Sequence, residues 1–393
     1  MPGSKTKPSV LHVITAVARG GAENHLFDLV QGQVDAGWNV AVAFLKSDGD
    51  RYWQQPFEKL GVKTKDLCLS RYGQVSPMFR LRRFIDHESP SLVHAHLPPA
   101  ELYTRVALMG RPDVPLVISK HNDKAFMSLP FATVVERWCA SRASRVIAIS
   151  GAVSRYFAER WSKPLSDRLV TIHYGLDPAP YGPQSEEAAG RLREEWGVAP
   201  DDFLVGTVAR LTAQKALDVM LRGFAGAVAR EPASFAKLVI VGRGELERKL
   251  KTLCSELGLS DRVLFAGFRT DIPAVMRSFD LFALTSDFEG FGLVLLEAQA
   301  AERPVLATAV SAIPEVVSDG VTGVLVPRQD HQAFADALLR FCDPKMRQKF
   351  GSAGAQRVRD SFPPSAMIRR TLDVYSTLNK SSGQAANGSA ETV

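Results

Sequence analysis

The sequence predicts an α/β protein built from two doubly wound domains, each with a parallel sheet covered by helices on both faces. Three observations lead to this prediction. Apolar runs of about four to eight residues alternate with helix-forming segments along almost the whole chain. The alternation stops at a Pro- and Gly-rich stretch, residues 176–183, and then begins again. The length of 393 residues is enough for two domains with separate cores.

The first domain is expected to span residues 1–180. Its predicted strands are short apolar runs at residues 10–17, 40–45, 91–96, 116–119 and 145–150. The helical patterns between them lie at residues 24–36, 100–109 and 132–141. Ligands of open parallel sheets bind beyond the carboxyl ends of the strands, so we expect ligand contacts in the loops that follow these strands.

The second domain is expected to span residues 181–362. Its predicted strands lie at residues 203–208, 237–241, 263–266, 281–284, 305–308 and 323–326. A last helix at residues 363–378 is expected to pack back onto the first domain. Residues 380–393 consist largely of Gly, Ser and Ala, and we expect them to be disordered.

The composition is that of a globular protein, with 46% apolar and 23% charged residues. The four cysteines stand far apart without a C-x-x-C pair, which favours a reducing compartment and argues against disulfides or structural zinc. No signal-peptide pattern and no apolar stretch of about 18 residues occurs. We therefore expect a soluble, cytoplasmic protein.

The positive charge is concentrated in the first domain. The net charge is +6, and residues 1–180 carry 23 Lys and Arg against 16 Asp and Glu. Basic residues are interleaved with large apolar ones: Arg71, Arg80, Arg82 and Arg83 around Met78 and Phe79, and Arg137, Arg142 and Arg145 around Trp138. This pattern fits helices that lie on an anionic membrane surface, at the inner face of the cell membrane, although a solvated basic face is the alternative. Nucleic acid is not expected, because no recognition helix, RNP pattern or zinc finger is visible.

The turn between the strand at 281–284 and the helix that begins at Leu293 is the strongest candidate for a ligand site. It holds Glu289 beside two glycines, Gly290 and Gly292, which let the backbone approach a ligand. The N–H groups of Gly292, Leu293 and Val294 would open the helix toward an anion, and phosphate suits such a site best.

Glu297 lies eight residues after Glu289 and can face the same ligand from inside the helix. The alternative is a helix-entry carboxylate at Glu289 and a solvated residue at Glu297. A second loop, after the strand at 203–208, carries Arg210 and Lys215. Two cations at a strand end are placed to bind a diphosphate and to offset charge as it leaves, or they are simply surface cations.

Gly242, Arg243, Gly244 and Glu245 match half of a dinucleotide-binding fingerprint. Glu247 stands where the third glycine would fall, which argues against a standard NAD site.

The histidines of the first domain are the remaining candidates for chemistry. His94 and His96 share one face of a strand and could ligate a metal, but no third ligand is evident, so we expect one to pack and the other to line the cleft. His121 ends another strand and is expected to contact a sugar or phosphate, with a hydrogen-bonded structural histidine as the alternative. Residues 48–50 match the D-x-D of metal-dependent sugar transferases, which we interpret as coincidence, so no metal site is expected.

Glu289 and Glu297 with Gly290-Phe291-Gly292 between them resemble the E-x₇-E motif of retaining GT-B glycosyltransferases, most closely glycosyltransferase family 4. Further matches extend over nearly the whole chain: Gly20-Gly21-Ala22-Glu23, Val93-His94-Ala95-His96, Arg210 with Lys215, Gly242-Arg243-Gly244-Glu245, Pro304 to Thr308 and Pro314 to Gly323. The resemblance implies the GT-B architecture, in which two Rossmann-like domains face each other across a cleft.

The resemblance also implies a function. It implies transfer of a sugar, with its anomeric configuration kept, from a UDP- or GDP-linked donor to a glycan or lipid-linked acceptor. The expected setting is envelope or exopolysaccharide biosynthesis, and neither a metal nor a cofactor is implied. Only one carboxylate is expected near the sugar, so no paired acid and base is implied.

The family's roles transfer to matching positions of this chain. Arg210 and Lys215 would hold the diphosphate, Glu289 the sugar hydroxyls and Glu297 the ribose. Donor-binding contacts are also implied for Gly20, Gly21, His121, Gly242, Gly290, Phe291, Gly292 and Leu293. The chain departs from the family at Ala209 and Ala216, where glycine is usual, and at residues 173–177, which leaves the donor's identity and the hinge-side contacts open.

Two other function classes compete with this interpretation. A nucleotide-sugar epimerase of GT-B fold would need catalytic carboxylates in the first domain and no separate acceptor. A non-catalytic sugar-nucleotide binding protein would be expected to lack Arg210, Lys215 or Glu289, and all three are present.

Overall fold

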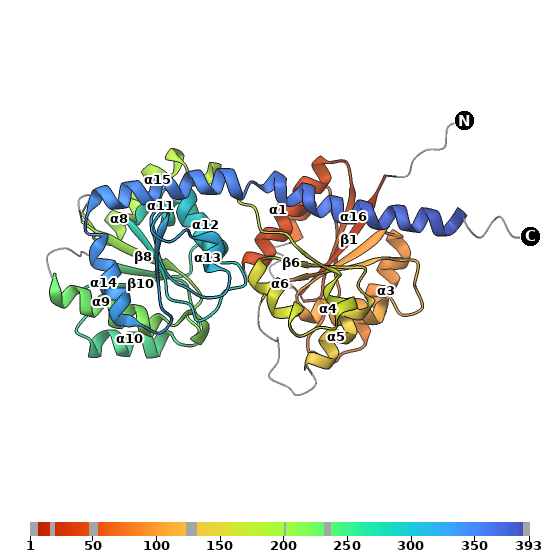
Figure 1. Ribbon diagram of the computed structural model, residues 1–393, viewed down its shortest axis with the longest axis horizontal. Coiled ribbons are helices and arrows are strands. Elements are labelled where there is room, and N and C mark those ends of the chain that lie inside the picture. The colour runs from red at the N-terminus through yellow and green to blue at the C-terminus, as the bar shows by residue number, and fades with distance from the viewer. Residues whose placement is uncertain are drawn as a thin grey trace, which may run out of the picture. The chain divides into compact units, whose positions relative to one another are not determined.

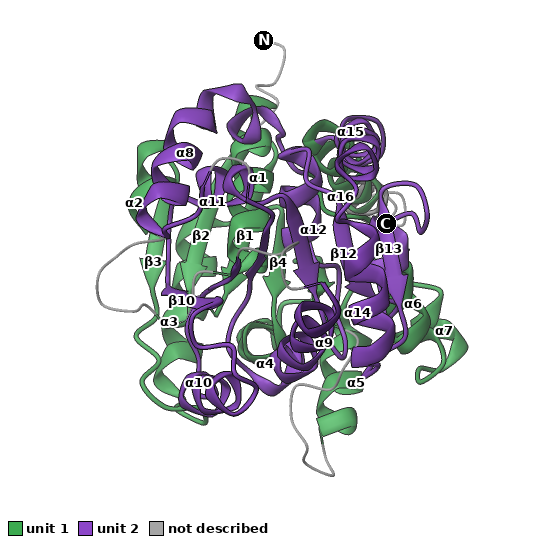
Figure 2. Ribbon diagram, turned by 90° about the vertical axis from the view of Figure 1, so that its left-hand side faces the viewer, with its two compact units in different colours: residues 1–175, 364–393 green, residues 176–363 purple. Residues whose placement is uncertain are grey.

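The computed structural model describes residues 7–15, 20–46, 54–122, 132–199, 202–231 and 237–387. The chain divides into two compact units, shown in separate colours in Figure 2: unit 1 is Met1–Gly175 with Pro364–Val393, and unit 2 is Leu176–Pro363. The chain passes from one unit to the other slightly before the boundary expected at residue 180. Each unit is a Rossmann-like parallel sheet with helices on both faces, which confirms the predicted fold class.

Unit 1 contains a seven-stranded sheet in the order β3-β2-β1-β4-β5-β6-β7, with every pair parallel. Its strands are β1 (Ser9–Ile14), β2 (Asn39–Phe44), β3 (Lys63–Asp66), β4 (Leu92–His96), β5 (Leu116–Lys120), β6 (Arg145–Ala148) and β7 (Leu169–Thr171). The strand order reverses between β1 and β4, so the carboxyl ends of these two strands form the switch point at which such sheets bind ligands.

The helices of unit 1 form two layers. Figure 1 shows α1 and α16 on one face of the sheet and α3, α4 and α5 on the other. The helices are α1 (Gly21–Asp35), α2 (Gln54–Lys59), α3 (Ser76–Glu88), α4 (Pro98–Ala107), α5 (Ala132–Arg142), α6 (Gly151–Ala158), α7 (Lys163–Ser166) and α16 (Pro364–Asn387).

The last helix, α16, belongs to unit 1 although it follows unit 2 in the sequence. It packs against α1, and its Tyr375 is fully buried. It continues to Asn387, so residues 380–387, which we expected to be disordered, extend the helix. This segment continues a helix that already exists, which costs less than nucleating a new one, and Ala385 and Ala386 are strong helix formers.

Unit 2 contains a six-stranded parallel sheet in the order β10-β9-β8-β11-β12-β13. Its strands are β8 (Leu204–Val208), β9 (Lys237–Val241), β10 (Val263–Gly267), β11 (Leu281–Leu284), β12 (Val305–Thr308) and β13 (Gly323–Val326). All six were predicted, because both faces of this sheet are covered and the strands are therefore continuous apolar runs. The order reverses between β8 and β11, which places the switch point of unit 2 there.

The helices of unit 2 also cover both faces of their sheet. They are α8 (Glu186–Glu195), α9 (Leu217–Arg230), α10 (Glu247–Glu256), α11 (Ile272–Ser278), α12 (Leu293–Ala300), α13 (Ile313–Val316), α14 (His331–Arg340) and α15 (Pro344–Ser361), with 3₁₀ turns η1 (Ala179–Tyr181), η2 (Pro183–Ser185) and η3 (Ala213–Lys215). Among the described residues, no helix combines the length and the apolar content needed to cross a membrane. All four cysteines are free thiols.

Candidate active site

Two loops meet at the switch point of unit 2. The loop after β8 carries Arg210 and ends in η3 with Lys215, and the loop after β11 carries Glu289. Backbone and side-chain hydrogen bonds join them: the Asp287 N–H donates to the Gln214 carbonyl at 2.8 Å, and Gln214 Nε2 donates to a carbonyl of the β11 loop at 2.9 Å. These bonds hold Lys215 and Glu289, which are 74 residues apart in the sequence, side by side.

The Lys215 ammonium donates directly to the Glu289 carboxylate. The Ser286 hydroxyl donates to the same carboxylate oxygen at 2.6 Å. The side chains of Lys215 and Glu289 are only 13% and 9% exposed. A nearly buried ion pair is tolerated only when further hydrogen bonds offset desolvation, and Ser286 supplies one of them. The structure therefore brings together two residues that the sequence predicted separately.

Thr285 fixes the backbone from which Lys215 projects. Its hydroxyl donates to the carbonyl oxygens of Lys215 and Ala216, at 3.1 and 3.0 Å. Ala216 adopts a left-handed conformation with φ of 43°, where glycine would be unstrained. This geometry explains why the departure from glycine at this position has a conformational cost.

Arg210 is exposed on a loop that packs tightly against the glycines after β9. A Cβ atom on Gly242 would lie 1.9 Å from the carbonyl oxygen of Ala209, and one on Gly244 would lie 2.3 Å from that of Leu211. The half fingerprint is thus required by backbone packing within unit 2, which holds the Arg210 loop in place.

The turn into α12 has the predicted form. Gly292 precedes the helix with φ of 84°, and no side chain caps the N-terminus. The Phe291 ring is buried and packs edge-to-face on Phe362 with ring centroids 5.8 Å apart, so Phe291 can offer a ligand only its backbone. Glu297 lies inside α12 and is 9% exposed. The other two predicted residues of this turn, Gly290 and Leu293, are buried.

Of the predicted residues of unit 1, His121 contacts Tyr174 directly. Gly20 and Gly21 begin α1, the helix that follows β1, and His25 on α1 stacks on Tyr174 with ring centroids 4.1 Å apart. The Tyr174 hydroxyl is hydrogen-bonded to Nδ1 of His121, and His121 also contacts His25 with ring centroids 6.0 Å apart. Tyr174 is one of the residues at which the chain departs from the family pattern, and it is the direct hydrogen-bond partner of His121.

The structure corrects the prediction for His94 and His96. Both rings are fully buried, with centroids 4.0 Å apart, and neither lines a cleft. The reason is the position of β4 between β1 and β5, with Tyr375 of α16 covering the rings. The parallel register also pairs His12 with His94, so a third buried histidine joins the cluster.

Three histidines so close together invite comparison with a metal site. Every ring nitrogen of the three has a hydrogen-bond partner: His12 Nδ1 with His96 Nε2 at 3.0 Å, His12 Nε2 with Gln33 Oε1 at 2.9 Å, His94 Nδ1 with the Tyr375 hydroxyl at 2.5 Å, His94 Nε2 with Ser119 Oγ at 2.8 Å, and His96 Nδ1 with His121 Nε2 at 3.3 Å. A metal needs one free lone pair from each ring, and these contacts use them. The donor set fits a hydrogen-bonded network better than a metal centre. The D-x-D of residues 48–50 lies outside the described residues.

The rings of this network are held neutral. Burial lowers the pKa of His12 to about 4, and burial together with the neighbouring Lys120 charge lowers the pKa of His121 to about 3. Burial also takes the pKa values of His94 and His96 well below 6.5. Each ring therefore carries a single N–H at neutral pH.

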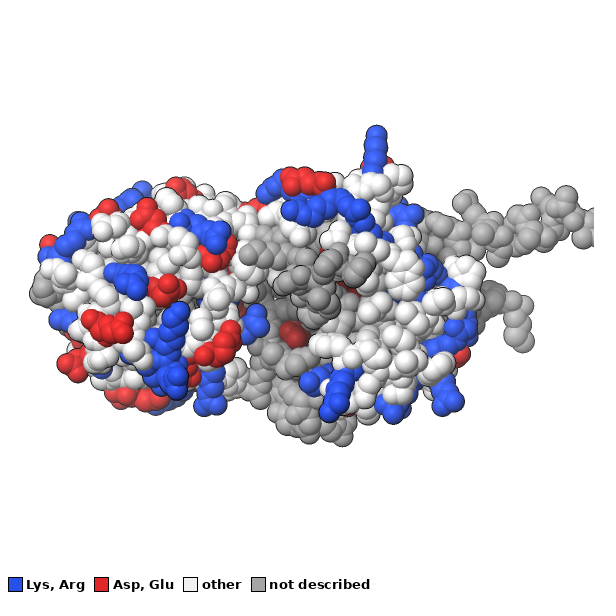
Figure 3. Space-filling model, turned by 90° about the horizontal axis from the view of Figure 1, so that it is seen from below, with Lys and Arg blue, Asp and Glu red and all other residues white. Residues whose placement is uncertain are grey.

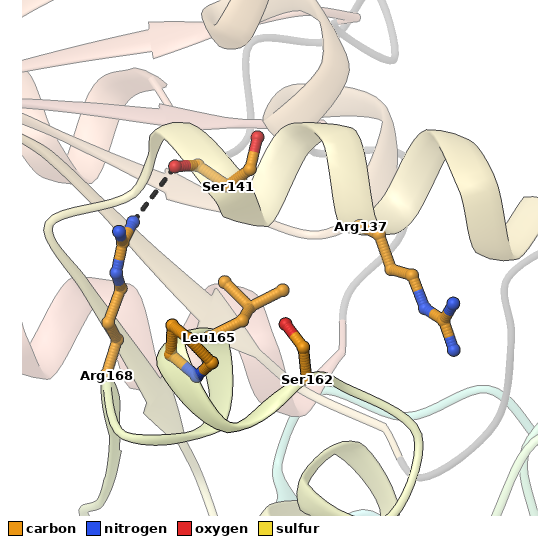
Figure 4. Close-up of a pocket in the computed structure, with 6 residues that line it drawn as sticks. Arg137, Ser141, Ser162, Leu165 and Arg168 are labelled. Carbon is orange, nitrogen blue, oxygen red and sulfur yellow. Dashed lines mark hydrogen bonds between the residues drawn. The ribbon is translucent and has the colours of Figure 1, made fainter.

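Unit 1 also has a cavity of about 310 Å³ away from its switch point, between α5 and α7 (Figure 4). It is lined by Arg137, Ser141, Ser162, Pro164, Leu165 and Arg168. Arg168 donates to the Ser141 carbonyl at 2.9 Å, so its guanidinium is already engaged by the protein. The cavity lies near the amino ends of β6 and β7. Ligands of this fold bind at the carboxyl ends of the strands, which is the opposite side of the sheet.

A third feature is a set of exposed apolar residues on α3, α4 and α5 and in the loops beside them, which we call the α3–α5 face. It consists of Tyr72, Val75, Phe79, Met109, Val134, Val135 and Trp138. Arg82 donates to the Met109 carbonyl at 2.7 Å, and the Arg105 guanidinium lies 4.3 Å from the centre of the Trp138 ring. Basic side chains therefore contact two residues of the α3–α5 face. Figure 3 shows this side of unit 1 as uncharged surface bordered by basic groups with few acidic ones.

Comparison with known proteins gives two family matches. The model of glycosyltransferase family 4 matches residues 19–180, and that of glycosyl transferases group 1 matches residues 189–357. A D-inositol 3-phosphate glycosyltransferase of Saccharomonospora viridis is 31% identical over 344 residues, which cover 81% of this chain and 77% of the relative. A lipopolysaccharide core biosynthesis mannosyltransferase, LpsB of Rhizobium meliloti, is 31% identical over 245 residues, 60% of this chain and 66% of the relative.

Solved structures share the fold. Anabaena Alr3699/HepE in complex with UDP-glucose aligns over 94% of this chain and 99% of its own, with a TM-score of 0.80 and 24% sequence identity.

Proposed function

The chain belongs to glycosyltransferase family 4 and is a glycosyltransferase of the GT-B type, and on this basis we propose that it transfers a sugar from a nucleoside-diphosphate sugar with retention of configuration. We propose a UDP- or GDP-linked donor, for which the UDP-glucose in a protein of the same fold is support. We propose a glycan or lipid-linked sugar as acceptor, in polysaccharide or envelope biosynthesis, in keeping with the lipopolysaccharide mannosyltransferase among the relatives.

The ion pair of Lys215 and Glu289 at the switch point of unit 2 is the observation that carries this proposal. A donor offers an anionic diphosphate and a sugar with hydroxyl donors. The diphosphate would attract Lys215 and the exposed Arg210, and the Glu289 carboxylate would accept hydrogen bonds from the sugar hydroxyls. Each partner of the pair thus matches one part of the donor.

In this mechanism the two cations act mainly on the leaving group. Negative charge builds up on the diphosphate as the bond to the sugar breaks, and fixed positive groups stabilise it most in the transition state. The open N-terminus of α12 adds backbone N–H groups, and Gly290, Phe291, Gly292 and Leu293 would contribute main-chain contacts. Glu297 would hold the ribose.

Unit 1 would contribute contacts of a different kind. We propose that Gly20 and Gly21 allow close approach of backbone to the substrate, and that His121 contacts the transferred sugar. The α3–α5 face suits an anionic membrane surface, because exposed aromatic residues and arginines occur together on it. A lipid-linked acceptor would be met at such a surface.

Activity of two single variants tests the site. Lys215→Ala and Glu289→Ala are expected to lower kcat/KM at least about a hundredfold, because each removes a group that meets developing charge or orients the sugar. Lys249→Ala removes an exposed lysine on α10 of the same unit, is the control, and should keep the wild-type rate. Nucleoside-diphosphate release and glycosylated product are measured together, with thermal unfolding to verify the fold.

Two results would contradict the proposal. Wild-type turnover in both site variants would exclude this pair from the chemistry. Conversion of the donor sugar in the absence of an acceptor would indicate an epimerase. Because Arg210 and Lys215 supply the positive charge, we also expect EDTA to leave the rate unchanged.

A further inference from the structure

We propose that His12 and His96 are positioning residues that transmit the orientation of the Gln33 amide to His121 and hold His121 as the Nε2–H tautomer, with Nδ1 as an acceptor for a sugar hydroxyl. The tautomer itself follows from contacts within unit 1. Its effect on catalysis rests on the proposed glycosyl transfer.

Gln33 on α1 is the first member of this network. Its carbonyl oxygen, Oε1, lies 2.9 Å from His12 Nε2, and its amide nitrogen donates to the Tyr375 hydroxyl at 3.5 Å. A carbonyl oxygen only accepts, so the hydrogen of the neutral His12 ring is on Nε2 and the lone pair is on Nδ1. Gln33 is fully buried, so the amide has no water to exchange these partners with.

Each following contact is then determined by the one before it. His12 Nδ1 can only accept, so His96 Nε2, 3.0 Å away, carries the hydrogen. His96 Nδ1 is then an acceptor, and it takes its hydrogen bond from His121 Nε2 at 3.3 Å. The remaining nitrogen of His121, Nδ1, must accept, and its donor is the Tyr174 hydroxyl.

Tyr174 and the burial pattern agree with this direction. Burial and the nearby Glu23 charge raise the pKa of Tyr174, so its hydroxyl keeps its proton and can donate. His12 and His96 are fully buried, whereas His121 is partly exposed, so His121 is where the chain of rings reaches the surface.

The tautomer determines which ligand atom His121 can bind. An acceptor at Nδ1 pairs with a hydroxyl group and not with a phosphate oxygen, which has no hydrogen to donate. A sugar hydroxyl that replaced the Tyr174 hydroxyl would satisfy the same lone pair. Of the two ligands expected for His121, a sugar hydroxyl or a phosphate, the network therefore selects the hydroxyl.

Nitrogen NMR of the ¹⁵N-histidine-labelled full chain, without any substrate, tests the tautomer. Wild-type His121 is expected as Nε2–H. His96→Asn should retain this state, because its side-chain oxygen can replace Nδ1 as the acceptor, whereas His96→Leu should lose it. A wild-type His121 with its hydrogen on Nδ1 would mean that the Gln33 amide points the other way, and it would overturn the proposal.

Gln33→Glu provides an independent test of transmission. A carboxylate beside His12 would hold that ring protonated, so that it donates from both nitrogens. The direction of every following hydrogen bond then reverses, and His121 should appear as Nδ1–H. An unchanged His121 signal in a folded Gln33→Glu variant would overturn the proposal, and if this variant does not fold, the wild-type and His96→Asn spectra still decide it.

The effect on transfer is measured separately. His96→Leu is expected to lower kcat/KM about tenfold, the value of about one hydrogen bond, and His96→Asn to recover most of it. Equal losses in both variants would contradict the positioning role. Absence of transfer by the wild-type chain would remove the proposed function and leave the tautomer result standing.

Discussion

Glu289 has a hydrogen-bonding environment that keeps its carboxylate in one orientation. The Ser286 hydroxyl donates to it at 2.6 Å, and the backbone of Ser286 is itself fixed because Thr308 Oγ1 donates to the Ser286 carbonyl at 2.6 Å. Ser286 and Thr308 are both buried, so neither contact competes with water. Ser286 therefore orients Glu289 from within the protein.

Replacement of Ser286 by alanine tests that role. Ser286→Ala is expected to lower kcat/KM about tenfold and the free energy of unfolding by about 1.5–3 kcal/mol, because one hydrogen bond to a charged group is lost while the backbone stays in place. Steady-state kinetics and thermal unfolding measure the two effects. The exposed Ser352→Ala on α15 is the control, and an equal change in both variants would exclude an orienting role for Ser286.

Residue types and strand ends were enough to predict that Lys215 and Glu289 lie in loops at one edge of the sheet, because the carboxyl ends of neighbouring parallel strands converge. The histidine network was not predictable in the same way. His12 could have been found from the strand order, which places β1 beside β4. Tyr375 lies 281 residues after His94 in the sequence, and Tyr174 follows β7, the last strand of unit 1. No local sequence pattern therefore relates either tyrosine to the histidines.

Among the elements, the turn from β11 into α12 depends most on a single conformation. Gly292 has φ of 84°, and a Cβ there would lie 2.8 Å from the Leu295 side chain. Gly292→Ala is expected to lower the free energy of unfolding of unit 2 by about 1–2 kcal/mol, the cost of a left-handed conformation. Gly190→Ala on α8, where a Cβ meets nothing, should instead stabilise by about 0.5–1 kcal/mol.

Thermal unfolding measures both glycine variants. Changes of the same sign would contradict this account, since the two positions differ in backbone conformation and not in the substitution made. A donor-binding measurement on Gly292→Ala reports separately whether the N–H groups at the start of α12 have moved.

The burial of histidines between β1, β4 and β5 makes the stability of unit 1 depend on pH. The pKa of His12 is about 4 in the folded protein and 6.5 ordinarily, so below pH 6.5 the unfolded chain binds more protons than the folded chain. The free energy of unfolding is therefore expected to fall as the pH drops from 7 toward 4. His12 alone contributes about 3 kcal/mol over the full range.

Urea unfolding at pH 7, 6 and 5 measures this dependence, within a range where most carboxylates stay ionised. Tryptophan fluorescence reports mainly on unit 1, since four of the five tryptophans, at positions 38, 53, 138 and 161, belong to it. A stability that is flat across this range would contradict the assignment of neutral, buried rings.

Two strands of unit 1 escaped prediction for reasons of composition. β3 has the sequence Lys-Thr-Lys-Asp and lies at the sheet edge, with side chains that are partly or fully exposed. β7 has only three residues, Leu169–Thr171, and forms the other edge. An edge strand needs little apolar surface, so the hydrophobic pattern that predicts central strands is weak there.

At the scale of the whole molecule, exposed apolar residues are distributed unevenly between the units. Seven large hydrophobic residues form the α3–α5 face of unit 1, whereas only Phe268 and Val321 are comparably exposed among the described residues of unit 2. The excess of Lys and Arg lies in the same part of the chain. A protein binds an anionic membrane through a face that carries both apolar and basic side chains, and the α3–α5 face carries both.

Vesicle sedimentation tests this interpretation. The protein is expected to bind phosphatidylcholine vesicles that contain phosphatidylglycerol, to bind pure phosphatidylcholine weakly, and to be released by salt, because the basic groups act through screened electrostatics. Phe79 is 63% exposed and Trp138 is 38% exposed, so both rings can enter the interface. The double variant Phe79→Ser with Trp138→Ser should weaken binding at least about tenfold, since each large side chain is worth about 1.5–3 kcal/mol on full burial.

Phe268→Ser in unit 2 is the matched control, because Phe268 is an exposed aromatic residue outside the α3–α5 face. If it weakened sedimentation as much as the double variant, binding would not be specific to unit 1. Equal affinity for the two vesicle types would exclude the basic groups. Transfer to a water-soluble acceptor should be unaffected by the double variant, because Phe79 on α3 and Trp138 on α5 belong to helices and not to the loops that carry the proposed site residues.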